Sequence, residues 1–345
     1  MVVAPVDSTG GRLFFQDSGP VPDSTTYTTL VIYHGTALTG GVEFPKVLPL
    51  FPLHNIRAVV VNRRHYPGSA RFQQAQLDDL RHGREGYLHV VAQDVANFLS
   101  WFIDNEHVTP RSRDNKSGGL AILGWSSGGP VILSLFGQPD VIPKRLYAKI
   151  EPYLRAAIIY DSPMMAYGYS SDPPPGVPVQ KLAEALRTPE HFMKYVTGWF
   201  DHDLSSRSYA GLDYRWIGKD ASIDHITPEE LQKIVDPAAA FTADLGPASL
   251  PVVEPMLHRQ ADRALYDEDL ARSVLPDVRF TTLVCTRSGW HMVLGALENE
   301  KRYTAAVASG KTIRPNRFID VKNANHLLHW DDPETFCKVV AEALS

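Results

Sequence analysis

The sequence predicts an α/β fold in which helices flank a mainly parallel central sheet and a helical cap is inserted. Short β-branched runs alternate with longer helical patterns through residues 1–160 and again near the end, which is typical of βαβ units. The stretch 163–275 breaks this pattern, since it has several helical segments and no convincing β-branched run. We therefore predict an α/β core of residues 1–162 and 276–345, with a cap, or lid, of residues 163–275.

The strands and helices of the core are predicted from hydrophobic periodicity. Two helices are expected at 86–105 and 333–344, because apolar residues spaced three and four apart form one helical face. Pro333 suits the first turn of the second helix. Strands are expected where short apolar runs are rich in β-branched residues, at 12–16, 28–33, 57–62, 119–124, 155–160, 279–285 and 315–321.

The composition is that of a globular chain and disfavours several classes of function. Of 345 residues, 44% are hydrophobic and 21% charged, which suffices for a large buried core. The net charge is -5 and the longest basic run is the short segment 63–65, so nucleic acid is not an expected partner. No segment approaches the roughly 18 apolar residues that span a membrane. We expect a soluble cytoplasmic protein, a monomer or homodimer without membrane partners, that acts on a small-molecule substrate.

The two cysteines are not expected to take part in chemistry. Cys285 lies in an apolar, strand-like run and Cys337 in the amphipathic C-terminal segment. Neither has the spacing of a metal ligand or of a redox pair, so both are predicted to be small buried side chains. The sequence therefore supports no metal site.

The segment 124–128, Gly-Trp-Ser-Ser-Gly, is where we expect the chemistry. It directly follows the apolar run 120–123 and precedes the apolar run 131–136, so it stands where a strand becomes a helix. A nucleophile elbow requires this context, because its glycines leave room for a tight turn that holds the serine in a strained conformation. Ser126 is the predicted nucleophile. Ser127 is the rival, although that choice would place only one glycine correctly.

A second turn is expected to face the nucleophile. His34, Gly35 and Thr36 close the strand predicted at 28–33, and their backbone amides can point at the elbow. The amide of Ser127 and that of Thr36 or Gly35 are predicted to form an oxyanion hole, in which each donor lowers the barrier by about 3 kcal/mol in comparable sites. For the His34 ring we expect a structural role, holding the loop by a hydrogen bond.

His326 is the predicted general base. A serine needs one, because its hydroxyl is a weak nucleophile at neutral pH. His326 lies in the segment 323–330, after the last predicted strand and before the last helix, where a loop can bring an imidazole over the nucleophile. Of the thirteen histidines it alone combines such a loop with the correct order after Ser126. His329 is the rival.

These features resemble the α/β-hydrolase superfamily, specifically its lid-bearing branch of esterases, epoxide hydrolases and dehalogenases. The resemblance covers essentially the whole chain and implies an α/β-hydrolase fold, a Ser/His/acid triad, no cofactor, and a substrate pocket between core and lid. The features that carry it follow one another in the correct order: the opening segment 11–19, the turn at His34 and Gly35, the segment 64–69, the elbow at Ser126, and His326 followed by 332–336.

The triad acid departs from this resemblance. Relatives usually carry it just after the strand that follows the lid, but the segment 285–291 contains no carboxylate. Some relatives, including certain haloalkane dehalogenases, carry it one strand earlier, where Asp161 ends the apolar run 156–160. We predict Asp161 as the acid, with Glu298 as another candidate. The alternative is a structural role for Asp161, as in relatives that keep the usual acid.

The predicted reaction is hydrolysis of a carboxylic ester or lactone of a mid-sized hydrophobic molecule through an acyl-enzyme. A serine at the elbow argues against dehalogenase and epoxide hydrolase reactions, which need a carboxylate there. Amide, thioester and carbon-carbon bond cleavage remain open, as does a second class: a receptor, or a pathway enzyme for cyclisation, elimination or acyl transfer. The substrate contacts that we predict are Trp125, Met164, Trp199 and Trp290, although most lid aromatics are more simply explained as lid core.

Overall fold

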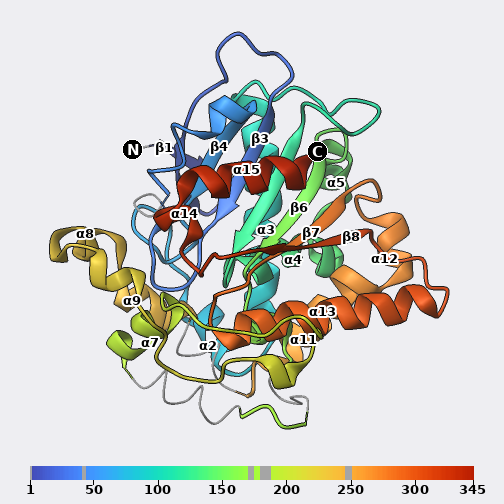
Figure 1. Ribbon diagram of the computed structural model, residues 1–345. Coiled ribbons are helices and arrows are strands. Elements are labelled where there is room, and N and C mark those ends of the chain that lie inside the picture. Colours follow the sequence, from blue (N-terminus) through green and yellow to red (C-terminus); the bar gives the residue numbers. More distant parts are fainter. Residues whose placement is uncertain (1, 41–43, 170–174, 179–187, 245–250) are drawn as a thin grey trace.

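The computed structural model describes residues 2–40, 44–169, 175–178, 188–244 and 251–345, and it is built around one eight-stranded sheet (Figure 1). The strand order is β1-β2-β4-β3-β5-β6-β7-β8. The pairs from β4 to β8 are all parallel, whereas β2 is antiparallel to both β1 and β4. The strands are β1 Val2–Pro5, β2 Arg12–Asp17, β3 Thr28–Tyr33, β4 Ile56–Val61, β5 Leu120–Trp125, β6 Leu154–Tyr160, β7 Arg279–Cys285 and β8 Asn316–Val321.

The central strands are the most apolar because both of their faces are covered. Every residue of β3, β4, β5 and β6 is buried, and such strands read as continuous apolar runs. All the predicted strands form, with ends that differ by at most one residue. Strand β1 was not predicted, because it is short and carries Pro5. Proline is tolerated at the sheet edge that β1 occupies.

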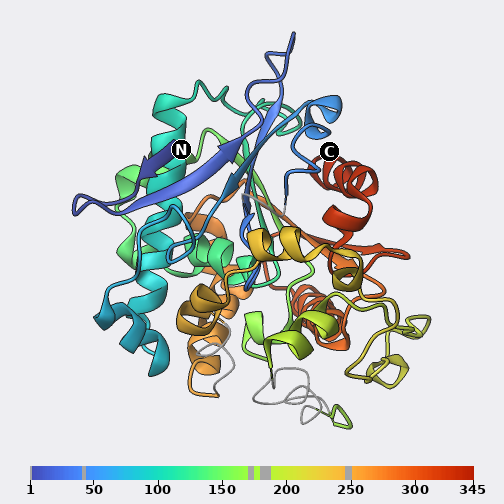
Figure 2. The same cartoon turned by 90° about the vertical axis from the view of Figure 1, so that its left-hand side faces the viewer.

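Helices cover both faces of the sheet (Figures 1 and 2). α3, Gly86–Asn105, and α4, Gly128–Gly137, lie on one face, and α15, Pro333–Leu344, lies on the other. The bounds of α3 and α15 are those that the periodicity predicts, and the predicted α/β fold is confirmed. Among the described helices, none combines the length and the apolar character of a bilayer span. The other helices of the core are α2 Gln74–Arg81, α5 Lys144–Ile150, α13 Trp290–Ala308 and α14 Leu328–Asp331, with shorter turns at η1 Phe51–His54 and η2 Pro139–Val141.

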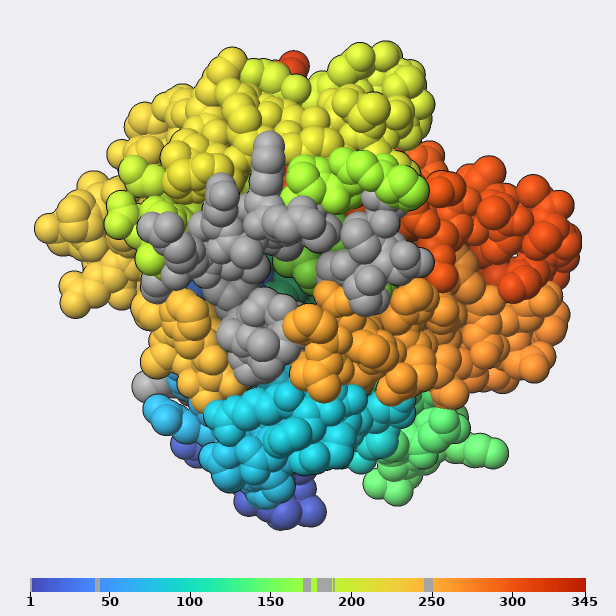
Figure 3. Space-filling model, turned by 90° about the horizontal axis from the view of Figure 1, so that it is seen from below, coloured from blue at the N-terminus to red at the C-terminus, as the bar shows by residue number. Residues whose placement is uncertain are grey.

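The chain between β6 and β7 covers the end of the molecule at which the parallel strands finish (Figures 1 and 3). Its described part consists of short helical segments joined by turns and irregular backbone, with isolated bridges such as that between Trp199 and Lys219. The lid boundaries at 163 and 275 stay a prediction. The helical segments are η3 Met164–Tyr167, α7 Pro189–Val196, η4 Tyr209–Gly211, η5 Ser222–His225, α8 Pro228–Ile234, α9 Pro237–Ala239, the π-helical η6 Ala240–Asp244, α11 Glu254–Tyr266 and α12 Glu268–Ser273.

The topology places the functional loops together. After β3 the chain adds β4 on one side and β5 on the other, so the strand order reverses at β3. In open α/β sheets, ligands bind outside the carboxyl ends of the strands at such a switch point. The loops that follow β3, β4, β5, β6, β7 and β8 all emerge at this edge, beneath the helices between β6 and β7.

Candidate active site

Ser126 occupies a strained turn between β5 and α4. Its φ angle of 54° lies in the left-handed region, which a residue with a side chain adopts only when its surroundings hold it there. The backbone is held on both sides: the Ser126 amide donates to the carbonyl of Tyr160 at 2.9 Å, and its carbonyl accepts from the hydroxyl of Ser162 at 2.7 Å. The hydroxyl of Ser126 therefore lies at the tip of the turn, where it can react.

The glycines on either side of Ser126 allow a very close approach of backbone to backbone. A Cβ atom on Gly124 would lie 2.2 Å from the carbonyl oxygen of Gly128. A Cβ atom on Gly128 would lie 2.2 Å from the carbonyl oxygen of Tyr33, at the end of β3. A larger residue at Gly124 would force apart the two ends of the elbow, and one at Gly128 would push the elbow away from β3.

Asp161 and His326 form a buried hydrogen-bonded pair. Oδ2 of Asp161 lies 2.7 Å from Nδ1 of His326, and the two side chains are almost completely buried. Asp161 directly follows β6 with a φ angle of 49°, another strained position. Because Nδ1 is engaged by the carboxylate, Nε2 is the nitrogen of His326 that remains for proton transfer.

The carboxylate of Asp161 is also held by the loop after β7. The backbone amide of Cys285 donates to Oδ1 at 2.8 Å, and the hydroxyl of Ser288 donates to Oδ2 at 2.5 Å. A buried carboxylate needs such partners, since transferring it from water without them is costly. The loop in which relatives usually carry the acid thus provides hydrogen-bond donors to an acid on the neighbouring strand.

Trp125 links the His326 loop to the elbow. Its indole nitrogen donates to the carbonyl of His326 at 3.1 Å, and the two rings lie 4.8 Å apart. Trp125 precedes Ser126 directly, so this contact fixes the loop that carries the imidazole beside the turn that carries the serine.

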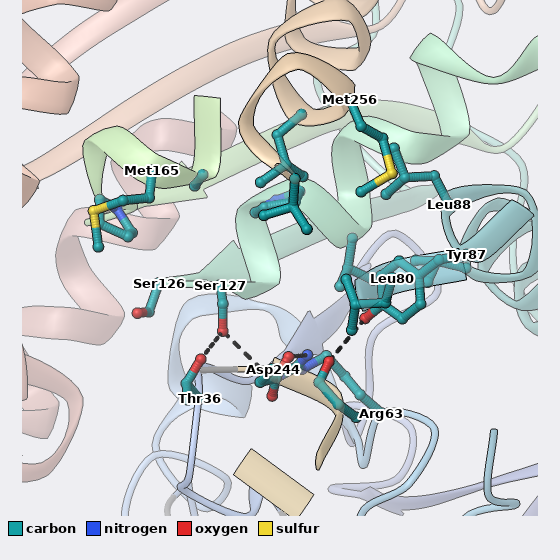
Figure 4. Close-up of a pocket in the computed structure, with 18 of the residues that line it drawn as sticks. Thr36, Arg63, Leu80, Tyr87, Leu88, Ser126, Ser127, Met165, Asp244 and Met256 are labelled. Atoms are coloured by element: carbon teal, nitrogen blue, oxygen red, sulfur yellow. Dashed lines mark hydrogen bonds and ion pairs between the residues drawn. The ribbon is translucent and has the colours of Figure 1, made fainter. Parts of the chain in front are cut away.

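Thr36 and Ser127, whose amides are predicted to form the oxyanion hole, lie beside Ser126 in the cavity. Their hydroxyls are 2.6 Å apart, and both residues line the same cavity as Ser126 (Figure 4). Within the described part of the chain, the backbone amides of Thr36 and Ser127 have no hydrogen-bond acceptor. Gly35 does not line this cavity, and a Cβ atom there would lie 2.9 Å from that of Ser126. The geometry favours Thr36 over Gly35 as the second donor.

The cavity extends from the elbow to the helices α2, α3 and α11. Ser126, Ser127 and Thr36 lie together at one end in Figure 4, and Leu80, Leu88 and Met256 lie at the other. An apolar cavity with a few polar groups at one end is typical of sites that bind small molecules. Its apolar walls are formed by Leu80, Leu88, Val91, Val131, Met165, Phe192, Val196, Val253, Met256, Leu257 and Met292, among others.

Comparison with known proteins decides the family. A family model described as the alpha/beta hydrolase family matches residues 30–339. This chain belongs to the alpha/beta hydrolase family. Comparison with curated protein sequences gave no match.

Solved structures share the fold of this α/β hydrolase at low sequence identity. A serine hydrolase from the polyaromatic-hydrocarbon-degrading bacterium Cycloclasticus zankles is 11% identical, with a TM-score of 0.56 over 99% of this chain and 96% of that one. A bromoperoxidase from Bacillus anthracis is 12% identical, with a TM-score of 0.52 over 99% of each chain. A carboxylesterase from Bacillus subtilis is 14% identical, with a TM-score of 0.51 over 99% of this chain and 90% of that one.

The two rival candidates of this α/β hydrolase, His329 for the base and Glu298 for the acid, have surroundings that differ from those of His326 and Asp161. His329 is fully buried and stacks on Phe44 with ring centroids 4.3 Å apart. Burial, with His326 nearby, holds the pKa of His329 well below its ordinary value. Glu298 bonds to the hydroxyl of Tyr209 and lies 3.7 Å from Lys301, whereas it is Asp161 that bonds to His326. The geometry therefore favours His326 and Asp161 over these rivals.

The four predicted substrate contacts are placed away from the cavity. Among the described residues that line it, Trp125, Met164, Trp199 and Trp290 are absent. Trp125, Met164 and Trp290 are buried in the core, and Trp199 pairs through its backbone with Lys219. The neighbouring residues Met165, His291 and Met292 line the cavity instead. Adjacent residues of a helical turn point to different faces of that turn. A sequence motif can therefore identify a segment that lines the cavity without identifying which of its residues faces the substrate.

Arg63 lines the cavity, although in the sequence it stands out only as part of the short basic run 63–65. Its guanidinium donates to both carboxylate oxygens of Asp244 at 2.7 and 2.5 Å, and to the carbonyl of Gly35 at 2.7 Å. Tyr66 also donates to Asp244 at 2.5 Å and accepts from the amide of Ala37 at 3.0 Å. Although burial opposes the charge, Asp244 raises the pKa of Arg63 above its ordinary value. The ion pair therefore joins the segment between β6 and β7 to the loop that carries the oxyanion position.

His34 supports the same loop. Its Nδ1 lies 2.8 Å from the carbonyl of Gly35, and its Nε2 accepts from the backbone amide of Arg63 at 3.0 Å. Nδ1 therefore carries the proton of a neutral ring. Burial, followed by the charge of Arg63, holds the pKa of His34 well below its ordinary value. The contacts are those of a structural residue, as the sequence suggests.

Proposed function

We propose that this α/β hydrolase is a serine hydrolase that cleaves a carboxylic ester or lactone of a mid-sized hydrophobic molecule through an acyl-enzyme. The observation that carries the proposal is the buried hydrogen bond of 2.7 Å between Asp161 and His326, in a loop that Trp125 ties to the elbow of Ser126. A carboxylate, an imidazole and a serine in this order form a unit that activates the serine hydroxyl.

In the proposed reaction, the hydroxyl of Ser126 attacks the substrate carbonyl and Nε2 of His326 takes its proton. The carbonyl oxygen becomes negative and accepts hydrogen bonds from the amides of Ser127 and Thr36. The intermediate then collapses: the bond between the carbonyl carbon and the ester oxygen breaks, and His326 returns its proton to that oxygen. Water, deprotonated by His326, attacks the acyl-enzyme and releases the acid and free Ser126.

Asp161 has the proposed role of holding the ring of His326 and stabilising the imidazolium that forms during attack. Its two oxygens are already paired with the donors from Cys285 and Ser288, so the carboxylate needs no reorganisation as the charge develops. The left-handed backbone of Asp161 turns its side chain out of β6 toward this position.

The substrate class is proposed from the cavity and from the elbow. The walls of the cavity are mainly apolar, and Ser126, Ser127 and Thr36 lie together at one end, which supports a hydrophobic substrate with its reacting group at that end. Serine at the elbow supports an acyl-enzyme, because alkyl-enzyme reactions of this superfamily use a carboxylate there.

Replacing Ser126 tests the proposal. Ser126→Ala is expected to abolish turnover of a panel of acyl esters and lactones and to abolish labelling by a fluorophosphonate probe, with little change in thermal stability. Ser127→Ala is the matched control, because it removes the neighbouring hydroxyl and keeps the backbone amide. Retention of most activity in Ser126→Ala would contradict the proposal, and so would a wild-type protein that neither labels at Ser126 nor turns over any ester.

A further inference from the structure

We propose that His291 binds the substrate, donating a hydrogen bond from its Nε2 to an uncharged acceptor oxygen that lies a few bonds from the scissile ester. The inference rests on the proposed function and narrows the substrate to hydrophobic esters or lactones that carry a second carbonyl, ether or hydroxyl oxygen. His291 lies near the start of α13 and lines the cavity together with Ser126. Its side chain is almost completely buried.

Tyr195 determines which nitrogen of His291 carries the proton. The hydroxyl of Tyr195, in α7, lies 2.8 Å from Nδ1 of His291, and the two rings stack with centroids 5.0 Å apart. Tyr195 is fully buried, and burial raises its pKa, so the phenol keeps its proton. Across the described residues no other acceptor bonds to this hydroxyl, so its proton is satisfied by donation to Nδ1.

His291 is therefore a neutral donor. Burial, with His326 nearby, lowers the pKa of His291 to about 3. A neutral imidazole carries one N–H, and because Nδ1 accepts from Tyr195, that N–H is on Nε2. The ring has no charge with which to attract a carboxylate, so its preferred partner is a neutral oxygen.

Nothing in the described part of the protein accepts the hydrogen bond from Nε2. When a substrate fills the cavity and displaces water, an N–H left without an acceptor costs about 1–3 kcal/mol, which a ligand oxygen would offset. The cavity wall contributed by the same two helices is otherwise apolar, since it consists of Phe192, Val196 and Met292. The donor thus stands alone on this wall, which makes it selective for substrates with an oxygen at one position.

The acceptor oxygen is placed near the reacting group by two observations. His291 and Ser126 line one cavity, and His326 is close enough to His291 to contribute to its lowered pKa. Electrostatic effects of that kind act over short distances inside a protein. The substrate oxygen that meets His291 therefore lies only a few bonds from the ester that meets Ser126.

Two series of esters test the proposal. The first is p-nitrophenyl hexanoate and its analogues with an ether oxygen in place of one chain methylene, and the second places the same replacements in the alcohol chain of hexyl butanoate. For each analogue, the ratio of its kcat/KM to that of the parent ester is compared between wild type and His291→Leu, which cancels intrinsic reactivity. For at least one analogue we expect this ratio to fall about fivefold in His291→Leu, the effect of one hydrogen bond.

The control variants separate recognition from packing. His291→Gln keeps an N–H donor and is expected to restore part of the ratio, whereas Met292→Leu changes the same wall without removing a donor and is expected to leave the ratio unchanged. A ratio that is the same in wild type and His291→Leu for every ester of both series would overturn the proposal.

The proposed function can fail separately from this inference. If wild type cleaves none of these esters and does not label at Ser126, the hydrolase proposal fails. The role of His291 as a donor is then tested by ligand binding. The affinities of the matching ketones, with and without the ether oxygen, are measured by quenching of tryptophan fluorescence. A preference for the ether ketones that His291→Leu abolishes would support the inference, and an unchanged preference would overturn it.

Discussion

The loops that follow β6 and β7 emerge from neighbouring strands at the same edge of the sheet, yet they contribute different chemistry. The first supplies a charge, the carboxylate of Asp161. The second, residues 286–289, has no carboxylate. Together with the last residue of β7 it supplies neutral donors, since the amide of Cys285 and the hydroxyl of Ser288 both bond to Asp161. Because both strand ends lie beside the loop of His326, either could carry an acid. In this chain one loop holds the charge and the other orients it.

Removing the negative charge of Asp161 is expected to have the largest effect on kcat. Asp161→Asn should lower kcat by about 10⁴, because the amide no longer stabilises an imidazolium and favours the wrong tautomer of His326. Steady-state kinetics would measure the loss, with thermal unfolding to verify folding. Glu298→Gln is the matched control and should change kcat little. A loss below about tenfold in folded Asp161→Asn would contradict the role of Asp161.

Moving the charge to the second loop would sharpen the comparison. In the double variant Asp161→Asn with Ser288→Asp, we expect kcat to recover about 10²-fold over Asp161→Asn alone, since residues of a triad act as a unit. The physical reason is that the Ser288 hydroxyl lies 2.5 Å from the oxygen that now binds His326. The control pairs Asp161→Asn with Ser288→Asn. Equal rates in the two double variants would show that only the end of β6 can carry the acid.

Removing a donor from the second loop is expected to cost less. Ser288→Ala should lower kcat about tenfold, the cost of one hydrogen bond to a charged group, because the amide of Cys285 still holds Asp161. KM should be unchanged, since Ser288 does not line the cavity. Ser288→Thr keeps the hydroxyl and should retain most of the activity. An equal loss of kcat in both variants would point to packing and not to the hydrogen bond.

The smallest effect expected is on the pH dependence of stability. The pKa of His291 is lowered to about 3, so below about pH 6.5 the unfolded chain binds a proton that the folded protein does not. Stability is therefore lost as the pH falls from about 6.5 toward 3, by up to about 1.4 kcal/mol per pH unit for this group. Urea unfolding at pH 7 and pH 5 should show a smaller loss in His291→Gln than in wild type. A loss as large in the variant would contradict this assignment.

Local signals were sufficient to predict most of the fold and the central residues of the candidate site. A strand, a tight turn and a helix in sequence predicted the elbow of Ser126, and the loop between the last strand and the last helix pointed to His326. Asp161 was predicted from its position at a strand end, where some relatives carry their acid. The contact between Asp161 and Ser288 was not predicted, because a serine in a loop has no distinctive pattern. The pair of Arg63 and Asp244 spans 181 positions of sequence, and no local pattern connects residues so far apart.

The cavity wall was the least predictable part of the site. Met165 and Met164 are neighbours in one short helical turn, but only Met165 lines the described cavity. Which of the two faces the substrate depends on the exact rotation of that turn against α11 and α13, a tertiary property that periodicity over four residues does not determine.

The ion pair of Arg63 and Asp244 has a consequence for the freedom of η6 to move. Asp244 lies at the end of η6, between β6 and β7, while Arg63 also holds the carbonyl of Gly35 in the core. A movement of η6 that withdraws Asp244 leaves a buried guanidinium without its partner, and breaking a buried pair in this way costs about 3–5 kcal/mol. It also removes a support of the loop that ends in Thr36. The pair therefore resists a movement of η6 away from the core, and it couples the position of η6 to that of the loop that ends in Thr36.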